Sequence, residues 1–174
     1  MNPAVGKAAA AQRAKELLRD EGVTMPPVPV ERLAKALGAK IRYAPLDDTL
    51  SGMAHIQDDV AIIGVNSMHH PHRQRFTIAH EIAHLLLHRE YIANAVHVDK
   101  DFVINRDEVA ASGTDALEID ANTFAAELLM PAEWLRSAMT REVDLEDKNA
   151  LADIAKKFRV SVAALQNRLL NLSR

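Results

Sequence analysis

The segment from Arg75 to His88 constrains the fold most, because a narrow stripe of polar side chains runs along an otherwise apolar helix. At about 100° per residue, the polar positions occupy roughly a quarter of a turn. These positions are Thr77, His80, Glu81, His84 and His88. A helix that is apolar nearly all round must be buried, and burying polar groups without partners costs on the order of several kcal/mol. We therefore expect a partner for this stripe inside the protein.

Three residues of the stripe, His80, Glu81 and His84, form the order His-Glu-x-x-His. His80 and His84 lie one helical turn apart on the same face, so that one nitrogen of each ring can reach a single Zn²⁺ ion. Glu81 follows the first histidine and can take a proton from a water molecule at the metal. The alternative is a pair of core histidines bonded to backbone or carboxylate groups, since this motif also occurs by chance in unrelated helices. The buried stripe favours the metal site.

A catalytic zinc site usually has three protein ligands and one open position, so a third ligand must come from elsewhere. Glu118 is one candidate, on a second buried helix where Asn122 shares its face. Asp120, Thr123 and Glu127 lie on a different side of that helix, away from Glu118, and we expect this side to face water. The alternative for Glu118 is structural, because Asp115-x-x-Glu118 has the form of a capping box.

Other candidates for the third ligand are His88, Glu90 and Asp99. His88 extends the histidine stripe, but it lies roughly 12 Å along the helix axis from His80. We therefore expect His88 to support the ligands or to face the substrate. The metzincin pattern is excluded, because it requires glycine at position 87 and histidine at position 90, where the chain has Leu87 and Glu90.

The remaining pattern predicts a mainly helical α+β fold with a small sheet ahead of the active-site helix. We expect helices over 5–21, 30–37, 71–89, 115–130, 151–158 and 161–170, and strands over 40–43, 51–56 and 60–65. Residues 92–114 are expected to be mostly loop, and more mobile than the helices. We treat residues 1–25 as an N-terminal helical extension and residues 26–174 as one compact domain that ends in a helix pair.

The amino-acid composition limits the classes of function that the chain can have. The 174 residues are 48% hydrophobic, which is enough for one core, and they include no cysteine, so a metal must be held by His, Asp or Glu. The formal charge of −3 gives no sequence-wide basic field for nucleic acid. We find no signal-peptide pattern and no apolar stretch long enough to span a membrane, and we expect a cytoplasmic protein.

Two stretches together resemble the ImmA/IrrE family of metallopeptidases, namely Arg73–His88 and Glu118–Pro131. The similarity extends over most of residues 28–170. It implies a zincin-like core with a small sheet packed on the His-Glu-x-x-His helix. It also implies that His80, His84 and Glu118 bind zinc in a gluzincin-like arrangement, and that Glu81 is the catalytic base. Members typically cleave or regulate helix-turn-helix repressors, and such a protein is therefore the expected partner.

Other polar residues are candidates for supporting roles at the site. Asn122 is expected to support a ligand through a hydrogen bond. Tyr91, His55 and His97 are polar candidates for stabilising the oxyanion, without positional evidence. Manganese or iron could replace zinc, because two imidazoles and one carboxylate also suit non-haem Fe(II).

Two other functions compete with proteolysis. Residues 151–169 resemble a helix-turn-helix, and from Lys148 onward the chain has six Lys or Arg and one acid. We favour two packing helices over direct DNA binding, because a basic terminus is weak evidence alone. A regulatory module that keeps the zincin fold without catalysis is the second rival, and the intact motif argues against it.

Overall fold

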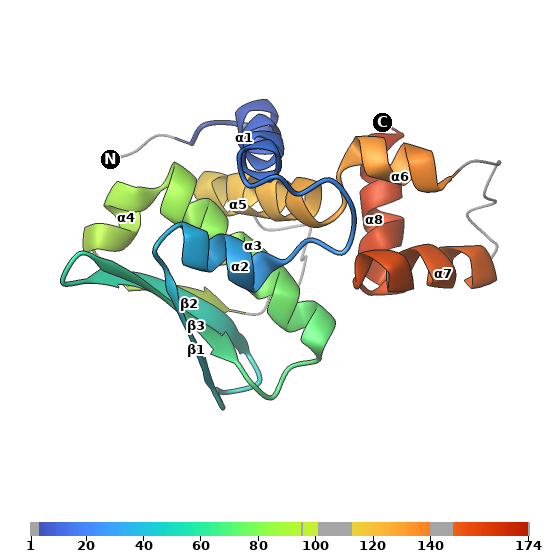
Figure 1. Ribbon diagram of the computed structural model, residues 1–174. Coiled ribbons are helices and arrows are strands. Elements are labelled where there is room, and N and C mark those ends of the chain that lie inside the picture. Colours follow the sequence, from blue (N-terminus) through green and yellow to red (C-terminus); the bar gives the residue numbers. More distant parts are fainter. Residues whose placement is uncertain (1–3, 95, 101–112, 140–147, 174) are drawn as a thin grey trace.

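The computed structural model describes residues 4–94, 96–100, 113–139 and 148–173 (Figure 1). The helices are α1 (Lys7–Asp20), α2 (Val30–Ala36), α3 (Pro71–Leu87), α4 (Arg89–Asn94), α5 (Gly113–Leu129), α6 (Ala132–Ala138), α7 (Lys148–Phe158) and α8 (Val162–Leu172). The strands are β1 (Lys40–Ala44), β2 (Leu50–Gln57), β3 (Val60–Asn66) and β4 (His97–Lys100). The predicted α+β class, with a small sheet packed on the motif helix α3, is confirmed.

The sheet has the strand order β1-β3-β2-β4. Strand β1 runs parallel to β3, whereas β2 is antiparallel to both β3 and β4. The β2–β3 hairpin turns at Asp58 and Asp59, which both have positive φ, 50° and 62°. Positive φ at two successive residues is the conformation of the tight hairpin turns whose twist matches the flanking strands.

The segment after α3 differs from the prediction of loop. Helix α4 extends to Asn94, and β4 pairs with the edge of β2. Strand β4 has only four residues, His-Val-Asp-Lys, and its pairing is a long-range contact that local propensity does not reveal. The predicted mobility of this segment stays a prediction, and residues 101–112 lie outside the described ranges.

Helix α5 is covered on the side that we expected to face water. Helix α1 packs against α5, and Asp120 and Glu127 are only 2% and 3% exposed. The expectation of a wet face is therefore wrong for these two residues, because α1 and the C-terminal helices supply their partners. Core residues of α1, such as Ala14 and Leu17, belong to the same apolar cluster as the rest of the protein. The division of the chain at residue 25 stays a prediction.

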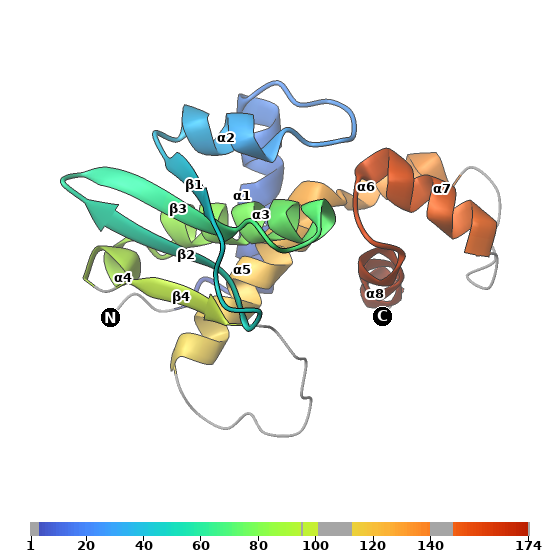
Figure 2. The ribbon, with the colours of Figure 1, turned by 90° about the horizontal axis from the view of Figure 1, so that it is seen from below.

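Two buried arginines connect the C-terminal helices to the core. Arg168 of α8 pairs with Glu127 and donates from Nε to the Met130 carbonyl at 3.2 Å. Arg75 of α3 donates to the Val28 carbonyl at 2.8 Å and to the Arg159 carbonyl at 3.3 Å. Figures 1 and 2 show α6–α8 grouped at the end of the molecule away from the sheet.

No helix in the described ranges is both long and apolar enough to cross a membrane.

Candidate metal centre

Helix α3 presents the motif because both of its ends are defined by local chemistry. Pro71 occupies the first turn, where its missing N–H costs nothing, and the ring of His70 accepts a hydrogen bond from the His72 N–H at 3.2 Å. The helix ends at Leu87, and its C-cap, His88, donates its N–H to the His84 carbonyl. The turns between these ends are buried, including His80, Glu81 and His84.

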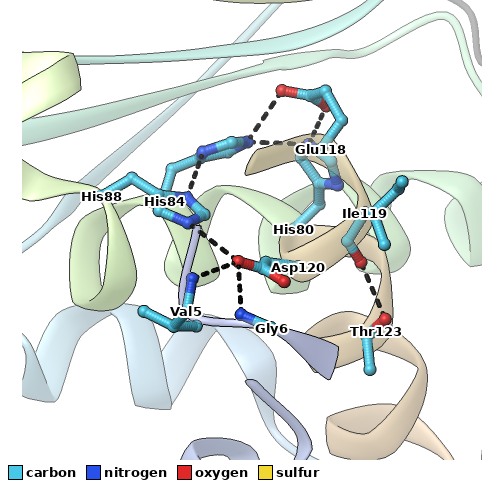
Figure 3. A network of polar contacts seen from close by, with 9 residues as sticks. All are labelled: Val5, Gly6, His80, His84, His88, Glu118, Ile119, Asp120 and Thr123. Carbon is cyan, nitrogen blue, oxygen red and sulfur yellow. Dashed lines mark hydrogen bonds and ion pairs between the residues drawn. The ribbon is translucent and has the colours of Figure 1, made fainter. Parts of the chain in front are cut away.

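The structure brings His80, His84 and Glu118 together (Figure 3). Nε2 of His80 lies 3.1 Å from Oε2 of Glu118, and Nε2 of His84 lies 3.3 Å from Oε1. The two Nε2 atoms are 3.1 Å apart. Ligands at tetrahedral positions, with zinc distances of about 2.0–2.1 Å, lie about 3.3–3.4 Å from one another. The three side chains therefore fit around one metal ion.

The other ring nitrogen of each histidine faces a partner that fixes the ring. Nδ1 of His80 lies 3.2 Å from Oδ1 of Asn122, and Nδ1 of His84 lies 3.1 Å from Nδ1 of His88. A neutral imidazole that binds a metal through Nε2 carries its hydrogen on Nδ1. Asn122 and His88 are thus placed to accept these hydrogens, a common way of orienting metal-binding histidines.

The charge state of Glu118 also suits a metal ligand. Burial alone would raise the pKa of its carboxyl group, but hydrogen bonds and charge from His80 and His84 lower that pKa well below its usual range. The group is therefore a carboxylate. The alternative capping role is wrong, because α5 begins at Gly113 and Asp115 lies inside the helix rather than at its N-cap.

Glu81 lies on the side of α3 that faces the sheet. It is fully buried, and its Oε1 is 3.5 Å from the point that a Cβ at Gly52 of β2 would occupy. The same Cβ would lie 2.3 Å from Cγ2 of Thr77 and 2.8 Å from the Gly64 carbonyl oxygen. Only glycine allows β2 to pass so close to the motif helix. The sequence pattern alone did not connect Gly52 with Glu81.

His88 has a second polar neighbour that sequence reasoning did not assign to the site. Its Nε2 lies 3.7 Å from Oδ2 of Asp120, and both side chains are buried. Burial lowers the pKa of His88 below its ordinary value, against the opposing effect of the Asp120 charge. The neutral ring that results can accept a hydrogen bond at Nδ1. In the sequence, only the helical spacing of His88 from His84 indicated that His88 lies near the site.

Of the remaining sequence candidates whose side chains the structure describes, Glu90 and His55 are not part of the cluster of possible ligands. Glu90 is exposed on α4, and Asp99 lies in β4. Tyr91 is half-buried on α4 and His55 lies in β2, while His97 begins β4. Their role in stabilising an oxyanion stays a prediction.

Two buried helices place two histidines and one glutamate around one point. This arrangement is a candidate metal centre of the kind found in metallopeptidases. A peptidase family model described as the IrrE N-terminal-like domain matches residues 34–170. The chain belongs to this family, which confirms the ImmA/IrrE resemblance.

The chain is also similar to a curated protein and to a solved structure. The radiation response metalloprotease IrrE of Deinococcus deserti is 32% identical over 165 residues, which cover 93% of this chain and 54% of the relative. The chain thus spans about half the length of this curated relative. A solved structure described as a Mycobacterium tuberculosis transcriptional regulator matches with a TM-score of 0.60 at 17% identity, over 90% of this chain and 45% of that chain. At this identity the likeness shows the fold alone.

Proposed function

We propose that the protein is a zinc-dependent endopeptidase in which His80, His84 and Glu118 hold the metal and Glu81 is the catalytic base. The observation that carries the proposal is the convergence of two Nε2 atoms and one carboxylate within hydrogen-bonding distances of one another. Two histidines and one glutamate are the ligand set of a common class of zinc peptidases. Membership of a peptidase family supports the same conclusion.

Each residue has a defined task in this account. A bound zinc ion supplies a Lewis acid that polarises the scissile carbonyl and acidifies the attacking water. Glu81 accepts the proton of that water and later passes it to the leaving amine. Its complete burial beside Gly52 keeps the carboxylate away from bulk solvent, where a general base would be less well oriented. Asn122 and His88 hold the two histidine rings.

The proposed substrate is a helix-turn-helix repressor protein met in the cytoplasm. This part of the proposal rests on the family resemblance of the two motif stretches. The name of the Deinococcus relative places a metalloprotease of this family in a radiation response, which suits a peptidase with a regulatory protein as its target. Direct binding of nucleic acid is not part of the proposal, because the apolar faces of α7 and α8 are used in packing.

The test is cleavage of a repressor encoded beside the gene for this chain. The zinc-loaded protein is incubated with the repressor, and fragments are identified by mass spectrometry. Glu81→Gln is the control, because it keeps the size and burial of the side chain but removes the base. We expect fragments with the wild type and none with Glu81→Gln. Equal fragmentation by both proteins would contradict the assignment of Glu81.

A further inference from the structure

A chain of polar contacts leads from the candidate metal centre to the segment that precedes α1 (Figure 3). It starts at His84, whose Nδ1 lies 3.1 Å from Nδ1 of His88. Nε2 of His88 lies 3.7 Å from Oδ2 of Asp120, which is longer than a hydrogen bond. The same Oδ2 accepts hydrogen bonds from the backbone N–H groups of Val5 at 2.7 Å and Gly6 at 3.1 Å.

The direction of the hydrogens along this chain follows from the role of His84. If its Nε2 binds the metal, its Nδ1 carries the hydrogen and donates to His88. Nδ1 of His88 must then be the acceptor, so that the hydrogen of this ring sits on Nε2 and faces Asp120. The carboxylate therefore selects the form of His88 that can receive the His84 hydrogen.

The Asp120 carboxylate needs compensation, because it is 2% exposed and a buried charge without partners is costly. The N–H groups of the two residues just before α1 supply it, next to the positive end of the helix dipole. Gly6 is the N-cap of α1 and offers no side chain for capping. Its φ of 87° lies in the region that favours glycine. Asp120 of α5 thus binds the backbone immediately before α1, and 114 positions in the sequence separate it from Gly6.

We propose that His88 and Asp120 are positioning residues that hold the His84 ring in its metal-binding orientation, and that the Val5–Gly6 backbone holds Asp120. The N-terminal segment is then part of the support of the metal centre. This inference rests on the proposed function, since it presupposes that His84 binds the metal. Loss of such orienting partners typically lowers metal affinity by about 10–100-fold.

The first test compares two substitutions of His88. His88→Phe keeps an aromatic ring but removes the acceptor, whereas His88→Gln offers an amide oxygen that can accept the His84 hydrogen. Zinc affinity is measured by competition with a chromophoric chelator, and thermal unfolding of the metal-free proteins reports any loss of folding. We expect His88→Phe to bind zinc about 10–100-fold more weakly than the wild type, with substantial recovery in His88→Gln. Equal affinity of wild type and His88→Phe would overturn the role of His88.

The second test addresses Asp120 and the N-terminal segment. Asp120→Asn removes the charge, and its matched control is Glu127→Gln, which neutralises another buried carboxylate on the same helix. Val5→Pro removes one N–H donor, and Val5→Ala keeps that donor. The visible spectrum of the Co²⁺-substituted protein reports the ligand geometry. We expect altered spectra and weaker binding in Asp120→Asn and Val5→Pro, and wild-type behaviour in both controls. Wild-type spectra and affinity in Asp120→Asn and Val5→Pro would overturn this part of the proposal.

The outcomes separate the two proposals. A wild-type protein that binds zinc through His84, together with a His88→Phe variant that binds equally well, would overturn only the positioning role. A wild-type protein that binds no zinc or cobalt would overturn the proposed function, and the positioning role with it.

Discussion

At Gly52 the backbone of β2 lies so close to α3 that a methyl group would overlap Thr77 and the Gly64 carbonyl oxygen. We predict that Gly52→Ala lowers the free energy of unfolding by about 1–3 kcal/mol, the usual cost of overpacking a core. Because Glu81 is next to this contact, catalytic activity should fall as well. Urea unfolding measures the first effect. Adding Thr77→Ser to Gly52→Ala removes one of the two clashes and should restore part of the stability. If the double variant instead lost as much stability as the two single variants together, the contact between Gly52 and Thr77 would be contradicted.

Replacing Glu81 should have a different effect from replacing one of the proposed metal ligands. We predict that Glu81→Gln lowers kcat/KM for the proposed repressor substrate by about 10²–10⁴-fold, the range for losing a general base. Zinc content should stay at the wild-type level, because this side chain is not among the three that converge. Kinetics and elemental analysis of the same preparation measure the two quantities. Loss of zinc in Glu81→Gln would mean that Glu81 is a ligand or supports one.

At the scale of single elements, helix α5 shows what the helical repeat of the sequence can predict and what it cannot. The helical repeat placed Glu118 and Asn122 on one face, and the structure brings both next to the motif histidines. The repeat could not show what covers the other faces, because that depends on α1 and α8, which are distant in sequence. Asp120 and Glu127 were therefore expected in water and are buried instead. Strand β4 was missed for a related reason, since only pairing with β2 makes it a strand.

The connection between α5 and α8 gives a prediction at the same scale. Arg168→Met leaves the Glu127 carboxylate buried without its guanidinium partner. We expect the free energy of unfolding to fall by about 3 kcal/mol, the lower end of the range for breaking a buried ion pair. The lower end applies because Lys15 remains 4.0 Å from Glu127 as a second cationic partner. Denaturant unfolding measures the loss. Replacing Glu127 with Gln in the same chain should recover part of the stability, and no recovery would show that the loss comes from packing.

For the whole molecule, we predict that a bound metal contributes to stability, because its proposed ligands come from two helices that meet only in the fold. At a free zinc concentration of about 100 times the Kd, binding to the native state alone stabilises by about 2.7 kcal/mol. We predict that zinc raises the Tm of the metal-free wild type and that chelation reverses the change. Calorimetry with and without zinc measures this shift. A Tm shift of equal size in Glu118→Ala would indicate binding elsewhere on the protein.

The whole-molecule arrangement was less predictable than the site. Spacing within each helix predicted which side chains share a face. The family resemblance, and not the spacing, indicated that Glu118 lies beside the two histidines. The contacts of the N-terminal segment with Asp120 join residues more than a hundred positions apart, and nothing in the local pattern of Val5 and Gly6 indicates them. Long-range partners of this kind come only from the packed structure.

The most direct test of the central claim is the metal content of protein purified without a His-tag, measured by elemental mass spectrometry for the wild type, His84→Ala and Glu118→Ala. The account predicts close to one zinc per chain in the wild type and a loss of zinc in both variants. A wild type that stays free of metal after zinc is offered at neutral pH, or a Glu118→Ala variant that keeps its zinc, would contradict it.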